Sequence, residues 1–231
     1  MSLLELEAVT KRYRSGQRER TVLADVDLRL EAGELATVWG ARRSGRSTLL
    51  RIAAGVQTPD SGSVLFEGRP LEEGCIGTGV GYVAKTLRAK EEQGVLDQIA
   101  AVLLARGVGV HDARRRAREA FARAGGGRCA AMRISELDGG EALRVAIART
   151  LALEPKVLVI DEPAATVEIS ERDEILALLR KLAQDGVAVL ASTSEAEQLA
   201  GADVALTLRD GQLQGQVRGE GATVLPLRRG A

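Results

Sequence analysis

The chain has 231 residues, enough for one α/β domain with an inserted lobe, and its 45% hydrophobic content is ample for a packed, mainly aliphatic core. Basic and acidic residues balance at 32 each, so no overall charge draws the chain to nucleic acid or anionic lipid. Its apolar runs, such as 99–105, are far shorter than the ~20 residues that span a bilayer. We therefore expect a soluble chain that reaches a membrane only through a partner.

Strand patterns dominate the first third of the chain. Period-two alternation and short apolar runs bounded by turn residues are typical of strands. A helical pattern starts at Ser47 and continues to residue 56, directly after a glycine-rich turn. The predicted strands are 3–10, 21–30, 33–40, 63–68 and 79–84.

The rest of the chain changes from helices back to an alternation of strands and helices. Apolar residues recur at helical spacing in 94–107, 111–125 and 139–155. Strand and helix patterns then alternate, and this arrangement predicts a mostly parallel sheet with an inserted helical lobe. The last predicted elements are a strand in 156–163, a helix in 170–186, a strand in 187–193, a short helix and a hairpin in 204–217.

The stretch 39–48, WGARRSGRST, resembles a phosphate-binding loop with one residue exchanged. It meets the pattern G-x-x-x-x-G-K-[ST] at Gly40, Gly45 and Ser47, but Arg46 stands in place of lysine. Backbone N–H groups bind phosphates where a strand, such a loop and a helix follow one another, and the Ser47 hydroxyl would face Mg²⁺. A plain strand–turn–helix remains the alternative. The candidate residues are Gly40, Ala41, Arg42, Arg43, Ser44, Gly45, Arg46, Ser47 and Thr48.

Two acids end the apolar strand 157–160. Carboxylates at the end of a buried strand are costly without a cation or a hydrogen-bond donor. Asp161 is therefore a candidate Mg²⁺ ligand, together with Ser47, and Glu162 is a candidate base that activates water. A purely structural role for the two acids is the alternative.

The segment 136–163, ELDGGEALRVAIARTLALEPKVLVIDEP, completes a series of motifs over nearly the whole chain. Their order resembles that of the ATP-binding subunits of ABC transporters, and 9–35 is most similar to the subfamily that serves lipoprotein-release and macrolide-export permeases. The resemblance implies that Tyr13 stacks on adenine. It also implies that Asp138, Gly139 and Gly140 form a signature loop, which meets the nucleotide of a second, head-to-tail subunit.

The resemblance also implies the fold and its division. We expect a P-loop NTPase core with a mostly parallel sheet, an N-terminal antiparallel β subdomain and an inserted helical lobe. The whole chain, 1–231, would be one ATP-binding domain. Its core would comprise 1–93 and 145–218, its helical lobe 94–144, and its loose tail 219–231.

Four positions near the terminal phosphate depart from the family pattern. Arg46 replaces the loop lysine, and its planar fork directs its donors differently. Lys85 stands where a glutamine is expected, and Asp138 stands where a serine donates to the partner's nucleotide, although a carboxylate only accepts. Ser194 occupies the position of the switch histidine. We expect these exchanges to impair hydrolysis more than binding, and count Glu162, Arg46, Ser194 and Lys85 as the catalytic positions.

The sequence thus predicts an ATP-binding subunit of an ABC transporter that uses ATP and Mg²⁺ and couples nucleotide-dependent closure to a membrane permease, with weak or impaired hydrolysis. It would dimerise, preferably with a different, intact ATP-binding subunit, bind no nucleic acid, and lie at the cytoplasmic face of the membrane. The alternatives are a scaffold that docks a permease without nucleotide, and an ordinary transport ATPase. The resemblance implies an ABC-type ATPase that converts ATP to ADP and phosphate, but the exchanged motif residues leave its enzymatic activity open.

Overall fold

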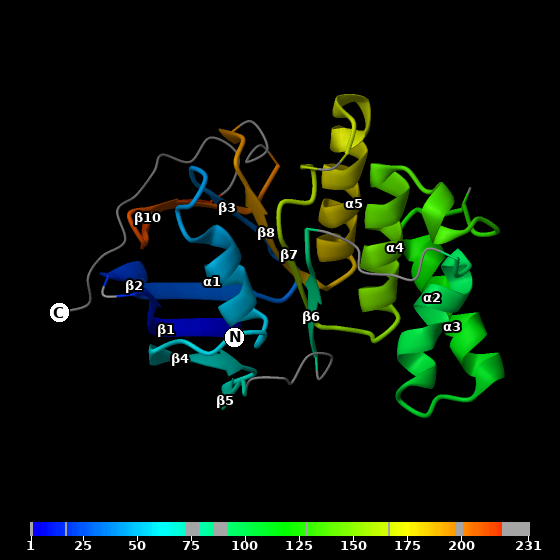
Figure 1. Ribbon diagram of the computed structural model, residues 1–231, viewed down its shortest axis with the longest axis horizontal. Coiled ribbons are helices and arrows are strands. Elements are labelled where there is room, and N and C mark those ends of the chain that lie inside the picture. The colour runs from blue at the N-terminus through cyan, green and yellow to red at the C-terminus, as the bar shows by residue number, and fades with distance from the viewer. Residues whose placement is uncertain are drawn as a thin grey trace.

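The computed structural model describes residues 2–16, 18–72, 79–85, 92–127, 129–165, 167–196 and 201–218. Strands and helices assemble into two sheets with helices between and beside them (Figure 1). The strands are β1 (Ser2–Ser15), β2 (Arg18–Glu31), β3 (Leu35–Trp39), β4 (Ser61–Phe66), β5 (Arg69–Pro70), β6 (Val80–Val83), β7 (Val157–Ile160), β8 (Ala188–Thr193), β9 (Val204–Arg209) and β10 (Gln212–Arg218). The helices are α1 (Arg46–Ala53), α2 (Val95–Leu104), α3 (Val110–Arg123), α4 (Gly139–Leu151), α5 (Arg172–Gln184) and the short 3-10 turns η1 (Ile134–Glu136) and η2 (Ile169–Glu171).

The N-terminal sheet is antiparallel, with the strand order β2-β1-β4-β5. Strands β1 and β2 continue several residues beyond the predicted segments, because their pairing runs on to Ser15 and Arg18. This extension places Tyr13 opposite Arg20 at the far end of the ribbon. The polar ends have no period-two apolar pattern, which is why the sequence predicted shorter strands.

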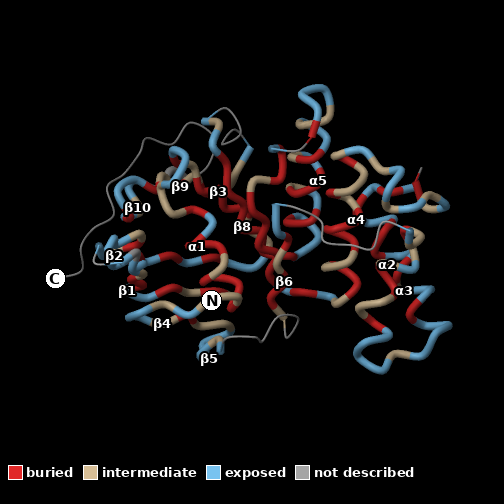
Figure 2. The backbone as a smooth tube through the Cα atoms, viewed as in Figure 1, coloured by how far each residue is buried: buried red, intermediate tan, exposed pale blue. Residues whose placement is uncertain are grey.

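The larger sheet confirms the predicted α/β class. Its order is β10-β9-β3-β8-β7-β6, and all neighbours are parallel except β9 and β10. In β7, Leu158 and Ile160 belong to one apolar cluster, whereas Val157 and Val159 belong to the other. Both faces of the sheet are thus covered, which explains the uninterrupted apolar run in this strand. Figure 2 shows the buried residues gathered in the central strands.

Helices cover the sheet on both sides. Helix α1 packs between the two sheets, whereas α5 packs on β3 and β8, and α4 lies against β6 and carries α2 and α3 (Figure 1). The predicted helices 94–107 and 111–125 end earlier than expected, since Gly107 and Gly125 follow them at φ 79° and 71°.

Within the described residues, no helix is long and apolar enough to cross a membrane. The short helix expected after residue 193 falls mainly on 197–200 and the tail on 219–231, both outside the described residues.

Candidate functional site

The carboxyl ends of four parallel strands meet at one edge of the larger sheet. Strands β3, β8, β7 and β6 are consecutive neighbours in that sheet. The segments that follow them begin with Gly40, Ser194, Asp161 and Ala84. Ligands of open parallel sheets bind at this edge, close to where the strand order reverses. The fold thus brings the candidate loop, the two acids and Lys85 together, although they are far apart in the sequence.

Residues 40–45 form a tight loop that leads directly into α1. Arg43 and Gly45 have left-handed backbones, with φ of 65° and 108°, and Gly45 is the N-cap of the helix. A Cβ on Gly45 would lie 2.8 Å from the carbonyl oxygen of Val22, so this turn requires glycine. The left-handed turns and the free N–H groups of the first helical turn form a concavity suited to an anion.

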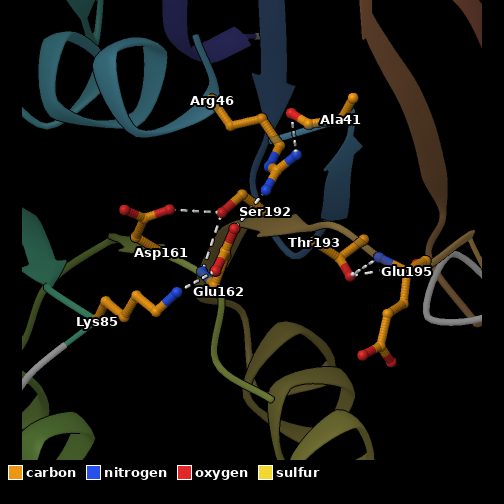
Figure 3. A network of polar contacts seen from close by, with 8 residues as sticks. All are labelled: Ala41, Arg46, Lys85, Asp161, Glu162, Ser192, Thr193 and Glu195. Carbon is orange, nitrogen blue, oxygen red and sulfur yellow. Dashed lines mark hydrogen bonds and ion pairs between the residues drawn. The ribbon is translucent and has the colours of Figure 1, made fainter. Parts of the chain in front are cut away.

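The side chain of Arg46 turns back beneath its own loop (Figure 3). Its guanidinium donates to the carbonyl oxygen of Ala41 at 2.9 Å and forms an ion pair with Glu162. Only 5% of Arg46 is exposed, so the group depends on these two acceptors. The planar fork of arginine suits this double contact.

Glu162 lies between two cations. Arg46 holds Oε1, and the ammonium of Lys85 lies 2.5 Å from Oε2 (Figure 3). Burial alone would raise the pKa of Glu162, but the hydrogen bonds and charges of Lys85 and Arg46 outweigh it and hold the pKa below its ordinary value. Its φ of 47° turns the backbone sharply after Asp161. Glu162 is therefore an ionised and well-compensated carboxylate.

Asp161 is held by a residue that the sequence did not single out. The buried hydroxyl of Ser192 donates to Asp161 Oδ1 at 2.7 Å and accepts from the backbone N–H of Glu162 at 3.0 Å. One side chain of β8 therefore orients both acids at the end of β7. The available signal was a serine within an apolar strand, because a buried hydroxyl needs a partner.

A cleft of about 790 Å³ opens over the loop. Eleven of the predicted site residues line it: Tyr13, 41–48, Lys85 and Glu162. Arg20, Arg51 and Gln57 also line it, and the sequence did not predict them. Altogether six basic residues and one acidic residue surround the cleft, which gives it a strongly positive field.

Tyr13 lines the same cleft as Glu162. Its hydroxyl accepts from the Gln57 amide at 2.7 Å and lies 3.4 Å from the hydroxyl of Thr48. Burial raises the pKa of Tyr13, but the hydrogen bonds with Thr48 and Gln57 and the charges of Arg51 and Lys11 lower it further, leaving it below the ordinary value. The side chain is exposed at 40%, so its ring is available to a ligand.

Other predicted residues lie outside the lining of this cleft. Gly40 lines a neighbouring cleft that shares residues 41–44, Asp161 is buried, and Ser194 is exposed at the end of β8. Asp138, Gly139 and Gly140 lie at the start of α4, where the Asp138 carboxylate accepts from the backbone N–H of Glu141 at 2.7 Å. These three residues do not meet the loop of their own chain.

Comparisons with known proteins agree with this geometry. A family profile described as ABC transporter matches residues 23–165. The lipoprotein-releasing system ATP-binding protein LolD of Gluconobacter oxydans (strain 621H) is 33% identical over 226 residues, which cover 92% of this chain and 95% of that protein. The macrolide export ATP-binding/permease protein MacB 1/2 of Paracoccus denitrificans (strain Pd 1222) is 31% identical over 220 residues, which cover 91% of this chain but 33% of that protein.

Solved structures resemble nearly the whole chain. The dimeric structure of MJ0796, described as a bacterial ABC transporter cassette, has a TM-score of 0.84 and 26% identity, covering 94% of this chain and 99% of that one. The same values hold for a dimeric post-hydrolysis state of that cassette bound to ADP and Pi. The resemblance predicted from the motif order is confirmed.

Proposed function

Because this chain belongs to the ABC transporter family, as an ATP-binding subunit, we propose that it binds ATP in the basic cleft and drives a membrane permease by nucleotide-dependent closure, with weak hydrolysis. The observation that carries this proposal is the pairing of Glu162 with both Arg46 and Lys85 inside the cleft. The loop and its positive field favour binding, and the paired carboxylate disfavours catalysis. The chain would act at the cytoplasmic face of the membrane, held there by the permease.

Nucleotide binding uses groups that the four exchanges leave intact. The N–H groups of the loop and of the first turn of α1 would hold the phosphates, and the exposed ring of Tyr13 would stack on the base. Ser47 and Asp161 offer the oxygen donors that Mg²⁺ prefers and would hold it. When bound, Mg²⁺ would neutralise charge on the phosphate oxygens.

Hydrolysis would be slow because the site offers a poor base. Both oxygens of Glu162 hold cations, and a carboxylate with a lowered pKa accepts a proton from water less readily. The exposed Ser194 cannot act as a histidine would. Losing one preorganised donor costs ~10²–10³ in rate, and such losses do not simply multiply. We expect turnover about 10³-fold or more below that of a relative with intact motifs.

A different, intact ATP-binding subunit is the favoured partner. The Asp138 carboxylate caps α4, and the backbone N–H of Asp138 donates to Glu141 Oε2 at 3.2 Å. A Cβ on Gly140 would lie 2.5 Å from Glu171 Oε2, so a third carboxylate lies against the same helix start. These carboxylates would repel a triphosphate presented by a second copy. An intact partner would supply its own signature loop to the cleft of this chain.

Two measurements on the purified chain test the proposal. Titration calorimetry with ATP and Mg²⁺ should give a dissociation constant in the micromolar range, and steady-state phosphate release should be barely detectable. An absence of binding would favour a scaffold role in which Arg42, Arg43 and Arg46 exclude nucleotide. Turnover close to that of an intact relative would instead support an ordinary transport ATPase. If that turnover persisted in Glu162→Gln, Glu162 would not be the base.

A further inference from the structure

The charge of the cleft favours a ligand with a high negative charge. Six basic residues face the cleft against the single carboxylate of Glu162. Arg46 and Lys85 are already close enough to each other to hold one carboxylate between them. The basic residues attract a metal-free triphosphate through its full negative charge, whereas a bound divalent metal cancels part of that charge.

The carboxylate of Glu162 shows where anionic oxygens are accepted. It stands in for phosphate oxygens, because both groups accept charge-assisted hydrogen bonds from guanidinium and ammonium groups. Lys85 contributes to this position from the end of β6, with 52% of its side chain exposed. Its long, half-exposed side chain would allow the ammonium to move from Glu162 to an incoming phosphate.

The ammonium of Lys85 can replace a metal ion in its electrostatic role. An ammonium is a compact, strongly hydrated positive charge with three donors, and it stabilises phosphate oxygens as a point charge. The same ammonium disfavours a divalent cation beside it, since like charges raise the energy of both.

We propose that the cleft binds the metal-free triphosphate at least as tightly as its Mg²⁺ complex, with the ammonium of Lys85 in the role of the metal. This inference rests on the proposed function, in which the cleft is the nucleotide site. It assigns Lys85 as the residue that sets the metal requirement of binding. Oxygen donors at Ser47 and Asp161 still allow the Mg²⁺ complex to bind, but binding no longer depends on it.

Calorimetric titration of the purified chain with ATP, in excess Mg²⁺ and in EDTA, tests this inference. Ionic strength is kept equal in the two buffers, because screening alone changes the affinity of a basic cleft. The wild-type chain should bind ATP in EDTA with an affinity equal to or higher than in Mg²⁺. In Lys85→Gln, the affinity in EDTA should fall about tenfold more than the affinity in Mg²⁺, since the amide carries no charge.

Lys156→Gln is the matched control. Lys156 also forms an ion pair with a glutamate at 2.5 Å, to Glu67, and its side chain is 59% exposed, but it is not among the residues that line the cleft. The control should keep the wild-type ratio of the two affinities. Circular dichroism would verify that both variants fold.

The outcomes separate this inference from the proposed function. If EDTA abolishes binding while the Mg²⁺ complex binds, the inference is wrong and the proposed function stands. An equal loss in both buffers for Lys85→Gln would also overturn it, because Lys85 would then be an ordinary anion contact. If neither form of ATP binds the wild-type chain, the proposed function fails as well.

Discussion

The carboxylate of Glu162 is ion-paired to the buried guanidinium of Arg46, which lies 116 positions away in the chain. Lys85 occupies the other carboxylate oxygen, so the Glu162 carboxylate holds two cations before any ligand enters. A triphosphate in the cleft must therefore compete with Glu162 for both cations.

Removing this competitor should strengthen nucleotide binding. In Glu162→Gln, the neutral amide holds Arg46 and Lys85 less firmly, so we expect ATP to bind about tenfold more tightly, a gain of about 1.4 kcal/mol. Calorimetric titration with ATP measures the change. Glu168→Gln is the control, because Glu168 is exposed and is not among the residues that line the cleft. Unchanged or weaker binding in Glu162→Gln would contradict competition.

The same pairing should make folding stability depend on acid pH. The folded-state pKa of Glu162 lies below its ordinary value, so its ion pairs add stability that is fully present at a pH above that ordinary value. This stability is lost as the pH falls through the folded pKa. In urea unfolding, the wild-type chain should have a higher free energy of unfolding than Glu162→Gln at neutral pH, and this difference should shrink below about pH 4. If the difference in free energy of unfolding between the two proteins stays constant down to pH 3, the fold does not stabilise the charged form of the carboxylate.

Local patterns were enough to predict most of the strands and helices and the phosphate-binding loop, whereas Tyr13 and Lys85 were predicted from the resemblance in motif order. The apolar run before Asp161 predicts a strand buried on both faces. The glycine spacing of 40–45 predicts a loop, in which the structure shows left-handed backbone angles. Both signals lie within a few consecutive residues. The order of the motifs along the chain then predicted the fold class, a P-loop NTPase core.

The contacts of the site depend instead on how the strands are ordered. Arg46 and Lys85 reach the same carboxylate because β6 is the neighbour of β7 and only β8 separates β7 from β3. No local pattern encodes that order. The sequence therefore showed that Arg46 and Lys85 depart from the family pattern, but not that both pair with Glu162. Arg20 was missed for a related reason, since it reaches the cleft through the polar extension of the β1–β2 ribbon.

Two serines near the end of β8 should differ sharply in their effect on stability. Ser192→Ala removes the donor to Asp161 and the acceptor for the Glu162 N–H in a buried setting. We expect a loss of about 1–3 kcal/mol in the free energy of unfolding, measured by urea denaturation. Ser194→Ala, at an exposed position two residues later, should change it by less than about 0.5 kcal/mol. Equal effects of the two substitutions would mean that Ser192 does not hold the acids.

Asp138 has a structural role that can be separated from its effect on a partner. Its side chain caps α4, and serine is an equally good N-cap, so Asp138→Ser should keep the stability within about 0.5 kcal/mol. Asp138→Ala, which loses the cap, should cost about 1 kcal/mol in urea unfolding. A lower stability of the serine variant than of the alanine variant would contradict the capping role.

The partner effect of Asp138 should appear in self-association. Removing one of the three carboxylates at the start of α4 replaces an acceptor by a hydroxyl that can donate to phosphate. If a second copy presents its nucleotide here, ATP should promote dimerisation of Asp138→Ser more than of the wild-type chain, as sedimentation velocity would show. Asp138→Ala, without a donor, should dimerise less than the serine variant. Identical sedimentation of all three proteins with ATP would show that Asp138 does not oppose the pairing of two copies.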